Sequence, residues 1–444
     1  MFVGNCVVYI NWDGFAWYYY ELANKGSISK TPVINELIRQ GVLFGNAYTG
    51  IPSITNPMQS AVVSGAWPVT TGNCYRYYDT EKKTVIQFRR ENRAENIAEA
   101  AVRQGLTVAS VHQFILENRG TKAGDPARPY IWVGNHTDYE ARFNAAIKLI
   151  KGEPAGKGSS RVKLEKVPEL IAIYMDDLDG IGHNDRLAGR LTPFPAEARR
   201  LRKVINRLQR MDRKLGLFLQ ACRDAEIYES MSFILTSDHG MAPFGQQGAG
   251  PDDYGRSKLP DLIDSIRQLG YKVEVLAGGE KPEKDTQIVL VTAGLEVQLS
   301  FTGEFAGEDI EKIANGVKGK KYVGQIMKKD EMMNRGAMEG FADLLISPAV
   351  PYCFQTGSGS YKARGQHDSL DDRAQHIFSL MWGRGIKKGL AYDARIYNID
   401  FARTTARLLD IEGPRNATGR VLDDALSGRW AAMPANSSIR PRQQ

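Results

Sequence analysis

The amino-acid sequence predicts an α/β fold in which a central, mostly parallel sheet carries helices on both faces. Short apolar runs alternate along the chain with longer helical patterns, as expected for strands that are joined by crossover helices. Three of these apolar runs end in carboxylates, and an open parallel sheet binds its ligands beyond the carboxyl ends of its strands. The 444 residues allow two or three domains, or one large domain with an insertion.

The elements of the predicted core follow this alternation in order. Cys6–Ile10 is an apolar run typical of a buried strand. Thr31–Gly41 predicts a helix, because a proline follows the threonine, apolar residues recur at helical spacing and a glycine ends the pattern. The remaining predicted core elements are the helix Glu95–Gln104, the strands Leu106–Val111, Leu170–Met175 and Ser232–Thr236, and a long charged surface helix from Phe194 to about Ala225.

The pattern changes after Gly240, which divides the chain into four predicted segments. Gln246–Gly255 is rich in Gly, Pro and Asp and predicts a loop. Short strands (Tyr271–Leu276, Ile288–Thr292, Leu295–Phe301) and a helix near Asp309–Val317 follow it, and Ala342–Ile346 and Ile396–Leu409 return to the core pattern. The predicted segments are a first core part at residues 1–245, a small α+β insertion or cap at 246–340, a second core part at 341–430 and a loose tail at 431–444.

Charge and cysteine content argue against several classes of function. The formal net charge is +7, but the basic residues are scattered, which favours a solvated surface and small anionic substrates over a specific nucleic-acid site. The four cysteines are widely spaced, so neither a disulfide framework nor a zinc site made of thiolates is expected. No apolar run approaches the roughly eighteen residues of a membrane span. The oligomeric state is left open.

The N-terminal residues bear on cellular location. The strand-like run Cys6–Ile10 begins almost at once, and no basic stretch followed by an apolar one precedes it. A cytoplasmic location is therefore expected, whereas a chain trimmed at this end would be a secreted one.

The stretch Thr49–Gly65 places two hydroxyls at the start of a predicted helix. Ser53 and Thr55 stand between Pro52 and Pro57. Serine and threonine are favoured N-caps, so one interpretation is that they satisfy free N–H groups. A helix N-terminus also attracts anions, so the other interpretation is a nucleophile aimed at a bound phosphoryl or sulfuryl group. This stretch alone leaves both interpretations open.

Carboxylates and imidazoles gather where the predicted strands end. Asp13, Asp179 and Asp238 each follow a different strand, and three carboxylates at one sheet edge repel one another unless a cation neutralises them. Three of the six histidines stand in short acidic motifs, and mixed carboxylate and imidazole ligands suit zinc or a similar divalent ion. The motif histidines are His183, His239 and His367, whereas His112, His136 and His376 are expected to be ordinary surface or core residues.

In the order in which they occur, these motifs resemble those of the alkaline phosphatase superfamily. The strand ending in Asp13, the P-S-x-T-x-P turn, D-x-x-G-H, S-D-H-G-M and G-x-H are most similar to the type I phosphodiesterase/nucleotide pyrophosphatase family. The resemblance covers roughly residues 5–245 and 340–425. It implies an alkaline-phosphatase-like three-layer sandwich.

The resemblance further implies a site with two divalent metal ions, expected to be zinc, in which Thr55 is the nucleophile and Ser53 is not. A zinc-bound hydroxyl loses its proton readily, and two metals can stabilise the attacking and leaving oxygens of an in-line displacement. A covalent phospho-threonine is the implied intermediate. The implied ligands are Asp13, Thr55, Asp238 and His239 for one ion, and Asp179, His183 and His367 for the other.

The implied substrate is a small anion that contains phosphate or phosphonate, and the expected reaction is hydrolysis of a phosphodiester or nucleotide pyrophosphate bond. An asparagine that helps to hold a phosphoryl oxygen usually stands further along the family's nucleophile region. Here Met58 follows three positions after Thr55 and cannot donate a hydrogen bond, so Asn56, Gln59 or a helix N-terminal N–H is expected to substitute. The T-N-P sequence also resembles phosphonoacetate hydrolases, so a phosphonate hydrolase and a phosphomonoesterase stay open as alternatives.

Three tyrosines follow the helix that would carry the nucleophile. Tyr75, Tyr77 and Tyr78 lie where the family places substrate-pocket residues and are candidates for stacking on a base or an aromatic leaving group, although packing in a strand explains them equally well. The stretch Thr49–Gly65 contains no Arg or Lys to bind the extra charge of a monoester, which favours a diester unless Arg76 or Lys82 folds back over the site.

Other classes of protein fit the sequence less well. None of the four cysteines stands in the C-x-P-x-R motif of a sulfatase, and the P-loop motif of an NTPase is absent. Cofactor-independent phosphoglycerate mutases of the same superfamily use a serine and a larger inserted domain. A non-catalytic binding protein on this fold would be expected to have lost ligands, and none of the seven is missing.

Overall fold

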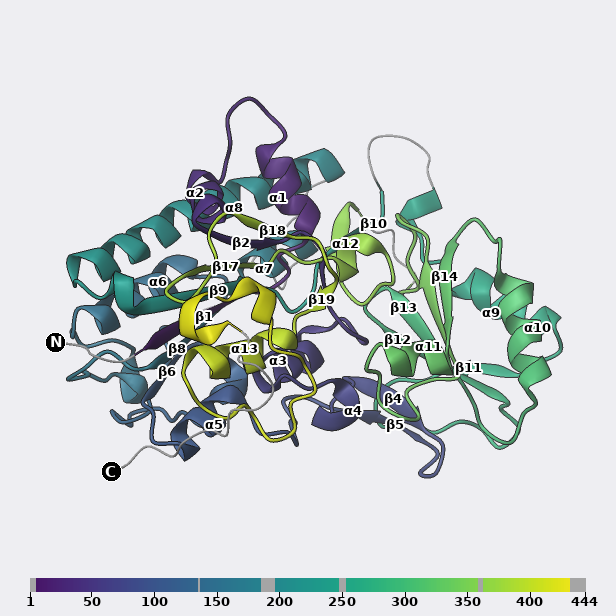
Figure 1. Cartoon of the computed structure of the whole chain (residues 1–444). Helices are drawn as coiled ribbons and strands as arrows, with labels where there is room; N and C mark the ends of the chain where they lie inside the picture. The colour runs from purple at the N-terminus through teal and green to yellow at the C-terminus, as the bar shows by residue number, and fades with distance from the viewer. Residues whose placement is uncertain (1–4, 135, 185–195, 247–252, 358–361, 432–444) are drawn as a thin grey trace.

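An eight-stranded sheet forms the centre of the computed structural model, which describes residues 5–134, 136–184, 196–246, 253–357 and 362–431 (Figure 1). The strand order is β18-β2-β17-β9-β1-β8-β6-β7. The five strands from β9 to β7 run parallel, whereas β17 is antiparallel to both of its neighbours. The strands are β1 (Cys6–Trp12), β2 (Gly41–Phe44), β6 (Val108–Val111), β7 (Tyr130–Ile131), β8 (Leu170–Met175), β9 (Met231–Thr236), β17 (Leu380–Gly383) and β18 (Leu390–Tyr392).

Each face of this sheet carries its own hydrophobic core. Alternate residues of a strand point to opposite faces, so Val8 and Ile10 of β1 pack on one side and Val7 and Tyr9 on the other. Helices α2 and α8 lie above the sheet in Figure 1, and α3, α5 and α13 lie below it. The predicted three-layer α/β fold is therefore confirmed. The helices of the two layers are α1 (Trp17–Asn24), α2 (Pro32–Gln40), α6 (Tyr139–Ile150) and α8 (Glu197–Asp224), and α3 (Thr55–Ser64), α5 (Ile97–Arg103) and α13 (Asp400–Leu408).

A second sheet, of five strands, lies beside the first (Figure 1). Its order is β11-β12-β13-β15-β14, and its strands pack with α9 and α10 around a separate core that includes Leu290, Leu299 and Ile313. We call this sheet, with its helices, the small unit. Its elements are α9 (Leu259–Gln268), β11 (Val273–Val275), β12 (Ile288–Ala293), β13 (Glu296–Phe301), α10 (Gly307–Val317), β14 (Val323–Lys328), α11 (Lys329–Asn334) and β15 (Leu344–Pro348).

One strand lies in a different sheet from the one that the sequence predicts. The sequence pattern groups Ala342–Ile346 with the large core, but β15 lies between β13 and β14 of the small unit. All five residues of β15 are buried, and a short buried run does not indicate which sheet a strand joins. Most of the predicted loop Gln246–Gly255, the start of the helix predicted from Phe194 and the tail from residue 432 onward lie outside the described residues.

Short elements connect the two sheets around the carboxyl edge of the large one. Strand β10 pairs with β16, β4 with β5, and β3 with β19. None of the described helices is long and apolar enough to cross a membrane. The short elements are β3 (Ala47–Tyr48), α4 (Pro68–Thr71), β4 (Arg76–Asp79), β5 (Thr84–Gln87), α7 (Asp177–His183), β10 (Ala242–Phe244), β16 (Arg364–Gln366), α12 (Asp372–Gln375) and β19 (Ile396–Tyr397).

Candidate active site

Three adjacent strands of the large sheet deliver carboxylates to one edge. Strand β1 lies between β8 and β9, and all three run in the same direction. Asp13 follows β1 directly, Asp238 follows β9 after one residue, and Asp179 stands in the first turn of α7, which follows β8. Asp13 and Asp238 are almost completely buried. The parallel register therefore brings together residues that are more than 200 positions apart in the sequence.

One half of the site combines these carboxylates with the predicted nucleophile. His239 Nε2 lies 3.4 Å from Asp13 Oδ1 and 3.5 Å from Asp238 Oδ2. Thr55 Oγ1 lies 3.1 Å from the same nitrogen. The ligand atoms of Asp13, Asp238 and His239 all lie within 4.8 Å of one another, a spacing at which one ion can contact them together.

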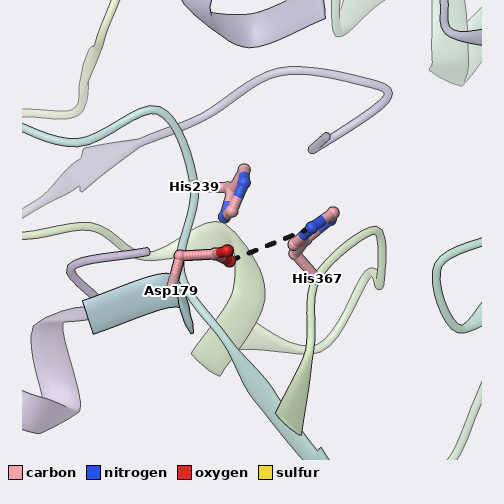
Figure 2. A group of neighbouring side chains, drawn as sticks. All are labelled: Asp179, His239 and His367. Atoms are coloured by element: carbon pink, nitrogen blue, oxygen red, sulfur yellow. Dashed lines mark ion pairs between the residues drawn. The ribbon is translucent and has the colours of Figure 1, made fainter. Parts of the chain in front are cut away.

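The other half of the site adjoins the first through His239. His183 Nε2 lies 3.1 Å and His367 Nε2 4.0 Å from Asp179 Oδ1. The ligand atoms of Asp179, His239 and His367 again lie within 4.8 Å of one another. Figure 2 shows these three side chains pointing toward a common centre. The structure thus brings all seven of the predicted ligands into one cluster.

The electrostatics of this cluster fit a bound cation. Burial, and then the charges of Asp238 and Asp179, raise the pKa of Asp13 well above its ordinary value. One oxygen of each of these three carboxylates is buried without a hydrogen-bond partner. Burial and the neighbouring imidazoles lower the pKa of His367 well below its ordinary value, which keeps its ring neutral, as a metal ligand must be. The cluster lacks positive charge, and a divalent ion would supply it.

Backbone carbonyls orient two of the imidazoles. His239 Nδ1 lies 3.0 Å from the carbonyl oxygen of Gly240, and His183 Nδ1 lies 3.1 Å from that of Gly365. With Nδ1–H donating to a carbonyl, the lone pair resides on Nε2, the nitrogen that faces the carboxylates.

The two candidate hydroxyls have different surroundings. Helix α3 begins at Thr55 and its N-cap residue is Ile54, so neither hydroxyl occupies the cap position. Thr55 Oγ1 faces His239, whereas Ser53 is buried and its Oγ accepts a hydrogen bond of 3.0 Å from Gln375 Nε2. Only Thr55 is presented to the cluster.

A large open cavity of about 1360 Å³ begins at Thr55 and Asn56. Of the predicted substrate-binding residues, Asn56 lines this cavity together with Thr55. Trp132 is 47% exposed, which is unusual for so large an apolar side chain. The other described aromatic and charged residues of the cavity wall are Arg89, Arg90, Glu91, His112, Phe114, Glu117, Tyr130, His136, Arg142, Lys157, Tyr174 and Asp176.

His112 supports the exposed Trp132 in the wall of the cavity. The His112 ring stacks on Trp132 at 6.4 Å, and its Nε2 accepts a hydrogen bond of 2.8 Å from the N–H of Val133. Burial, followed by the charge of Arg142, lowers the pKa of His112 to about 3, so this ring is neutral at physiological pH. Tyr174 also lines the cavity and its hydroxyl donates a hydrogen bond to Asp13, which links the cavity to the cluster.

The other predicted substrate-binding residues lie elsewhere. Gln59 is buried in a chain of side-chain hydrogen bonds, donating to Asn11 and accepting from Gln113, both at 2.8 Å. Tyr77 stacks on Phe88, and Tyr78 is buried against the small unit.

The remaining tyrosine and the two predicted cations near it are also engaged outside the cavity. The guanidinium group of Arg76 lies over the ring of Tyr75 and donates to Gln87, and Lys82 pairs with Asp79. Tyr75, Tyr77 and Tyr78 are not among the described residues that line the cavity. Strand β4 pairs with β5 instead, and Tyr78 packs against residues of the small unit.

The cavity wall was missed by the sequence analysis, although a signal for part of it exists. His112 directly follows β6 and Trp132 directly follows β7, so both stand at the same carboxyl edge as the carboxylates. The two-residue strand β7 is too short to be recognised from the sequence. His376 packs as expected, with its ring stacked between Tyr48 and Trp17.

Comparison with known proteins yields both sequence relatives and structural neighbours. Ectonucleotide pyrophosphatase/phosphodiesterase family member 1 from Homo sapiens is 22% identical over 406 residues, which are 89% of this chain and 39% of that protein. Family member 7 from Homo sapiens is 22% identical over 254 residues, 53% of this chain and 48% of that protein. The chain thus spans less than half the length of these curated relatives.

Solved structures share the fold. Murine ectonucleotide pyrophosphatase/phosphodiesterase 5, an inactive threonine-to-alanine variant in complex with AMP, has a TM-score of 0.63 at 14% identity and covers 96% of this chain and 100% of its own. The human protein of the same name gives 0.62 at 16%, with coverages of 95% and 100%. The family model of type I phosphodiesterase/nucleotide pyrophosphatase matches residues 7–326. Because this match spans well over half of the chain, the protein belongs to the type I phosphodiesterase/nucleotide pyrophosphatase family.

Proposed function

We propose that this protein is a metal-dependent hydrolase that cleaves phosphodiester or nucleotide pyrophosphate bonds through a covalent phospho-threonine at Thr55. The observation that carries this proposal is the position of the Thr55 hydroxyl, 3.1 Å from an imidazole of the carboxylate and histidine cluster. Thr55 also stands at the N-terminus of α3. Unsatisfied backbone N–H groups at a helix N-terminus bind phosphoryl oxygens, so a phosphoryl group held there would lie close to the Thr55 hydroxyl.

The donor set fits two divalent ions of the zinc type. Asp13, Thr55, Asp238 and His239 would hold one ion, and Asp179, His183 and His367 the other. When bound, such ions lower the pKa of a coordinated hydroxyl and offset the negative charge on phosphoryl oxygens.

The residues of the chain perform the displacement in two steps. Thr55 Oγ1 releases its proton to solvent and forms a bond to phosphorus, while the bond from phosphorus to the leaving oxygen breaks and the leaving group departs with the electron pair. A water oxygen then bonds to phosphorus, the bond from phosphorus to Thr55 Oγ1 breaks, and Oγ1 takes up a proton as the phosphate product leaves. Asn56, which lines the cavity with Thr55, would donate a hydrogen bond to a phosphoryl oxygen.

The cavity supports a substrate with a planar group next to the phosphate. Trp132 presents an exposed aromatic face, and Tyr174 and Phe114 line the same space. Aromatic side chains stack on nucleobases and aryl groups alike. A nucleotide ester fits this space, and a structural neighbour of this chain has been solved in complex with AMP.

Charge around the nucleophile favours a diester over a monoester. The stretch Thr49–Gly65 has no Arg or Lys, and Arg76 and Lys82 are engaged by Gln87 and Asp79. Arg142 lines the cavity, but it is paired with Asp176 at 2.9 Å. A monoester carries one more negative charge than a diester, and a cation to hold it would have to come from the outer cavity wall, which Arg89, Arg90 and Lys157 line.

A substrate panel with zinc supplied tests the proposal. Thymidine 5′-monophosphate p-nitrophenyl ester and bis-p-nitrophenyl phosphate are expected to give the highest kcat/KM, above p-nitrophenyl phosphate and phosphonoacetate. Protein purified without chelator is expected to contain about two zinc ions per chain by elemental analysis. A preference for phosphonoacetate would assign the protein to phosphonate hydrolysis, and a preference for the monoester would contradict the diesterase assignment. Absence of bound metal would contradict the mechanism.

A further inference from the structure

The turn between β12 and β13 of the small unit lies against the backbone of His367. The N–H of Leu295 donates a hydrogen bond of 3.1 Å to the carbonyl of Asp368. Gly294 has a φ of +53°, and a Cβ added there would lie only 2.3 Å from the carbonyl oxygen of His367 and 2.4 Å from Cβ of Asp368. Position 294 therefore has no room for a side chain, and its backbone conformation also favours glycine.

A buried pair of carboxyl groups joins the same two segments. Glu296, the first residue of β13, is 2% exposed, and Asp368 is 1% exposed. The two side chains are buried next to each other. The pair therefore packs the small unit against the residue after His367.

The opposite side of this loop is held by the turn that precedes the nucleophile. The N–H of Asp368 donates to the carbonyl of Ser53 at 3.0 Å. Gln375 Nε2 donates to Ser53 Oγ at 3.0 Å and to the carbonyl of Ser369 at 2.7 Å. Asp368 itself has a φ of +54°, a conformation that a non-glycine residue keeps only where its surroundings impose it. The segment carrying His367 is thus held between the small unit and the Ser53 turn.

We infer that the β12–β13 turn is a positioning element for His367, so that the small unit contributes to metal binding without supplying a ligand. Gly294 allows the close approach, the N–H of Leu295 bonds the carbonyl of Asp368, and the Glu296 side chain packs beside Asp368. The inference rests on the proposed function, since it concerns a residue proposed to bind a metal ion. Partners outside the ligand shell typically change metal affinity about 10- to 100-fold when they are removed.

A glycine substitution tests the close approach. Zn²⁺ is titrated calorimetrically into the metal-free full chain, and Gly294→Ala is expected to bind one of two ions at least about 10-fold more weakly than wild type. Gly428→Ala is the matched control, because Gly428 has a φ of +60° and a Cβ there would meet nothing within 4 Å. Gly319→Ala, also with open space and positive φ, controls for strain within the small unit. Both controls are expected to bind zinc like wild type.

A second pair of variants tests the carboxyl pair and does not depend on the glycine. Glu296→Ala is expected to weaken zinc binding about 10-fold, and Glu296→Gln, which keeps the size of the buried side chain beside Asp368, is expected to bind zinc like wild type. Gln298→Ala truncates a buried side chain two residues along β13 and is expected to leave zinc affinity unchanged. If Gly294→Ala does not fold, as judged by circular dichroism, the Glu296 variants decide alone.

The outcomes separate this inference from the function on which it rests. Two zinc ions bound by wild type, with equal affinity in Glu296→Ala, would overturn the positioning role and leave the proposed function intact. An equal loss in Glu296→Gln and Glu296→Ala would overturn it as well, since the packing of the side chain beside Asp368 would then be irrelevant. A wild-type chain that binds no zinc would overturn both.

Discussion

The cluster of carboxylates and histidines and the open cavity lie side by side at the same sheet edge but are built from different kinds of residue. The cluster consists of carboxylates and imidazoles that are buried or nearly so, at the ends of β1, β8 and β9. The cavity is lined largely by aromatic and basic side chains, of which Arg89, Trp132 and Lys157 are exposed, and the ends of β6 and β7 place His112 and Trp132 in its wall. Thr55 belongs to both.

This difference shows which part of a site can be recognised from the types of its residues. Buried like charges are unfavourable when they are uncompensated, so the cluster indicates a bound cation from its residue types alone. An exposed tryptophan or arginine costs little and needs no ligand to account for it. The chemical half of the site can therefore be argued from residue types alone, whereas the binding half needs the fold.

The largest expected effect comes from the residue shared by the two regions. Thr55→Ala is expected to lower kcat at least about 10³-fold, because it removes the nucleophile, while zinc binding at Asp179, His183 and His367 persists. Stopped-assay hydrolysis of a nucleotide ester and zinc analysis measure the two effects separately.

Ser53→Ala is the matched control for this variant. It removes a hydroxyl two residues away that bonds Gln375 and does not face the cluster, so most of the activity is expected to remain. If Thr55→Ala kept wild-type activity and Ser53→Ala lost it, the roles of the two hydroxyls would have to be exchanged.

The fold could be predicted largely because its core strands are apolar runs, some of which are followed by carboxylates. The predicted bounds of β8 match the structure at both ends, and those of β1, β6 and β9 lie within two residues of the observed ends, since burial on both faces leaves a continuous apolar pattern. The prediction that β15 belongs to the large sheet was wrong, because a short buried run does not indicate which strands it pairs with.

The candidate site divides in the same way. The seven ligands could be proposed because each stands in a motif of the family, and the structure brings them together. The tyrosines of β4 were proposed from their place after α3, but strand pairing with β5 turns Tyr77 toward Phe88. Trp132 follows a strand of two residues, for which the sequence gives no periodic signal.

A smaller expected effect concerns the pH response of the cavity wall. The pKa of His112 is lowered to about 3, against an ordinary value near 6.5. The unfolded chain therefore binds more protons between these values, and the free energy of unfolding falls as the pH falls below about 6.5. Between pH 7.5 and pH 5 wild type is expected to lose about 2 kcal/mol more than His112→Gln, which still accepts from the N–H of Val133 but does not titrate. Urea unfolding at the two pH values measures the difference, and equal losses would contradict a buried neutral His112.

The smallest expected effect decides which aromatic residues meet the substrate. Trp132→Ala is expected to raise KM for thymidine 5′-monophosphate p-nitrophenyl ester about 10-fold with kcat little changed, since stacking on a base contributes roughly 1–3 kcal/mol. KM for methyl p-nitrophenyl phosphate, which has no base, is expected to change less. Tyr77→Leu serves as the control from the tyrosine run, because Tyr77 packs on Phe88 outside the described cavity wall. A rise in KM confined to Tyr77→Leu would indicate that β4, and not the cavity, contacts the base. The cavity would then accommodate the leaving group.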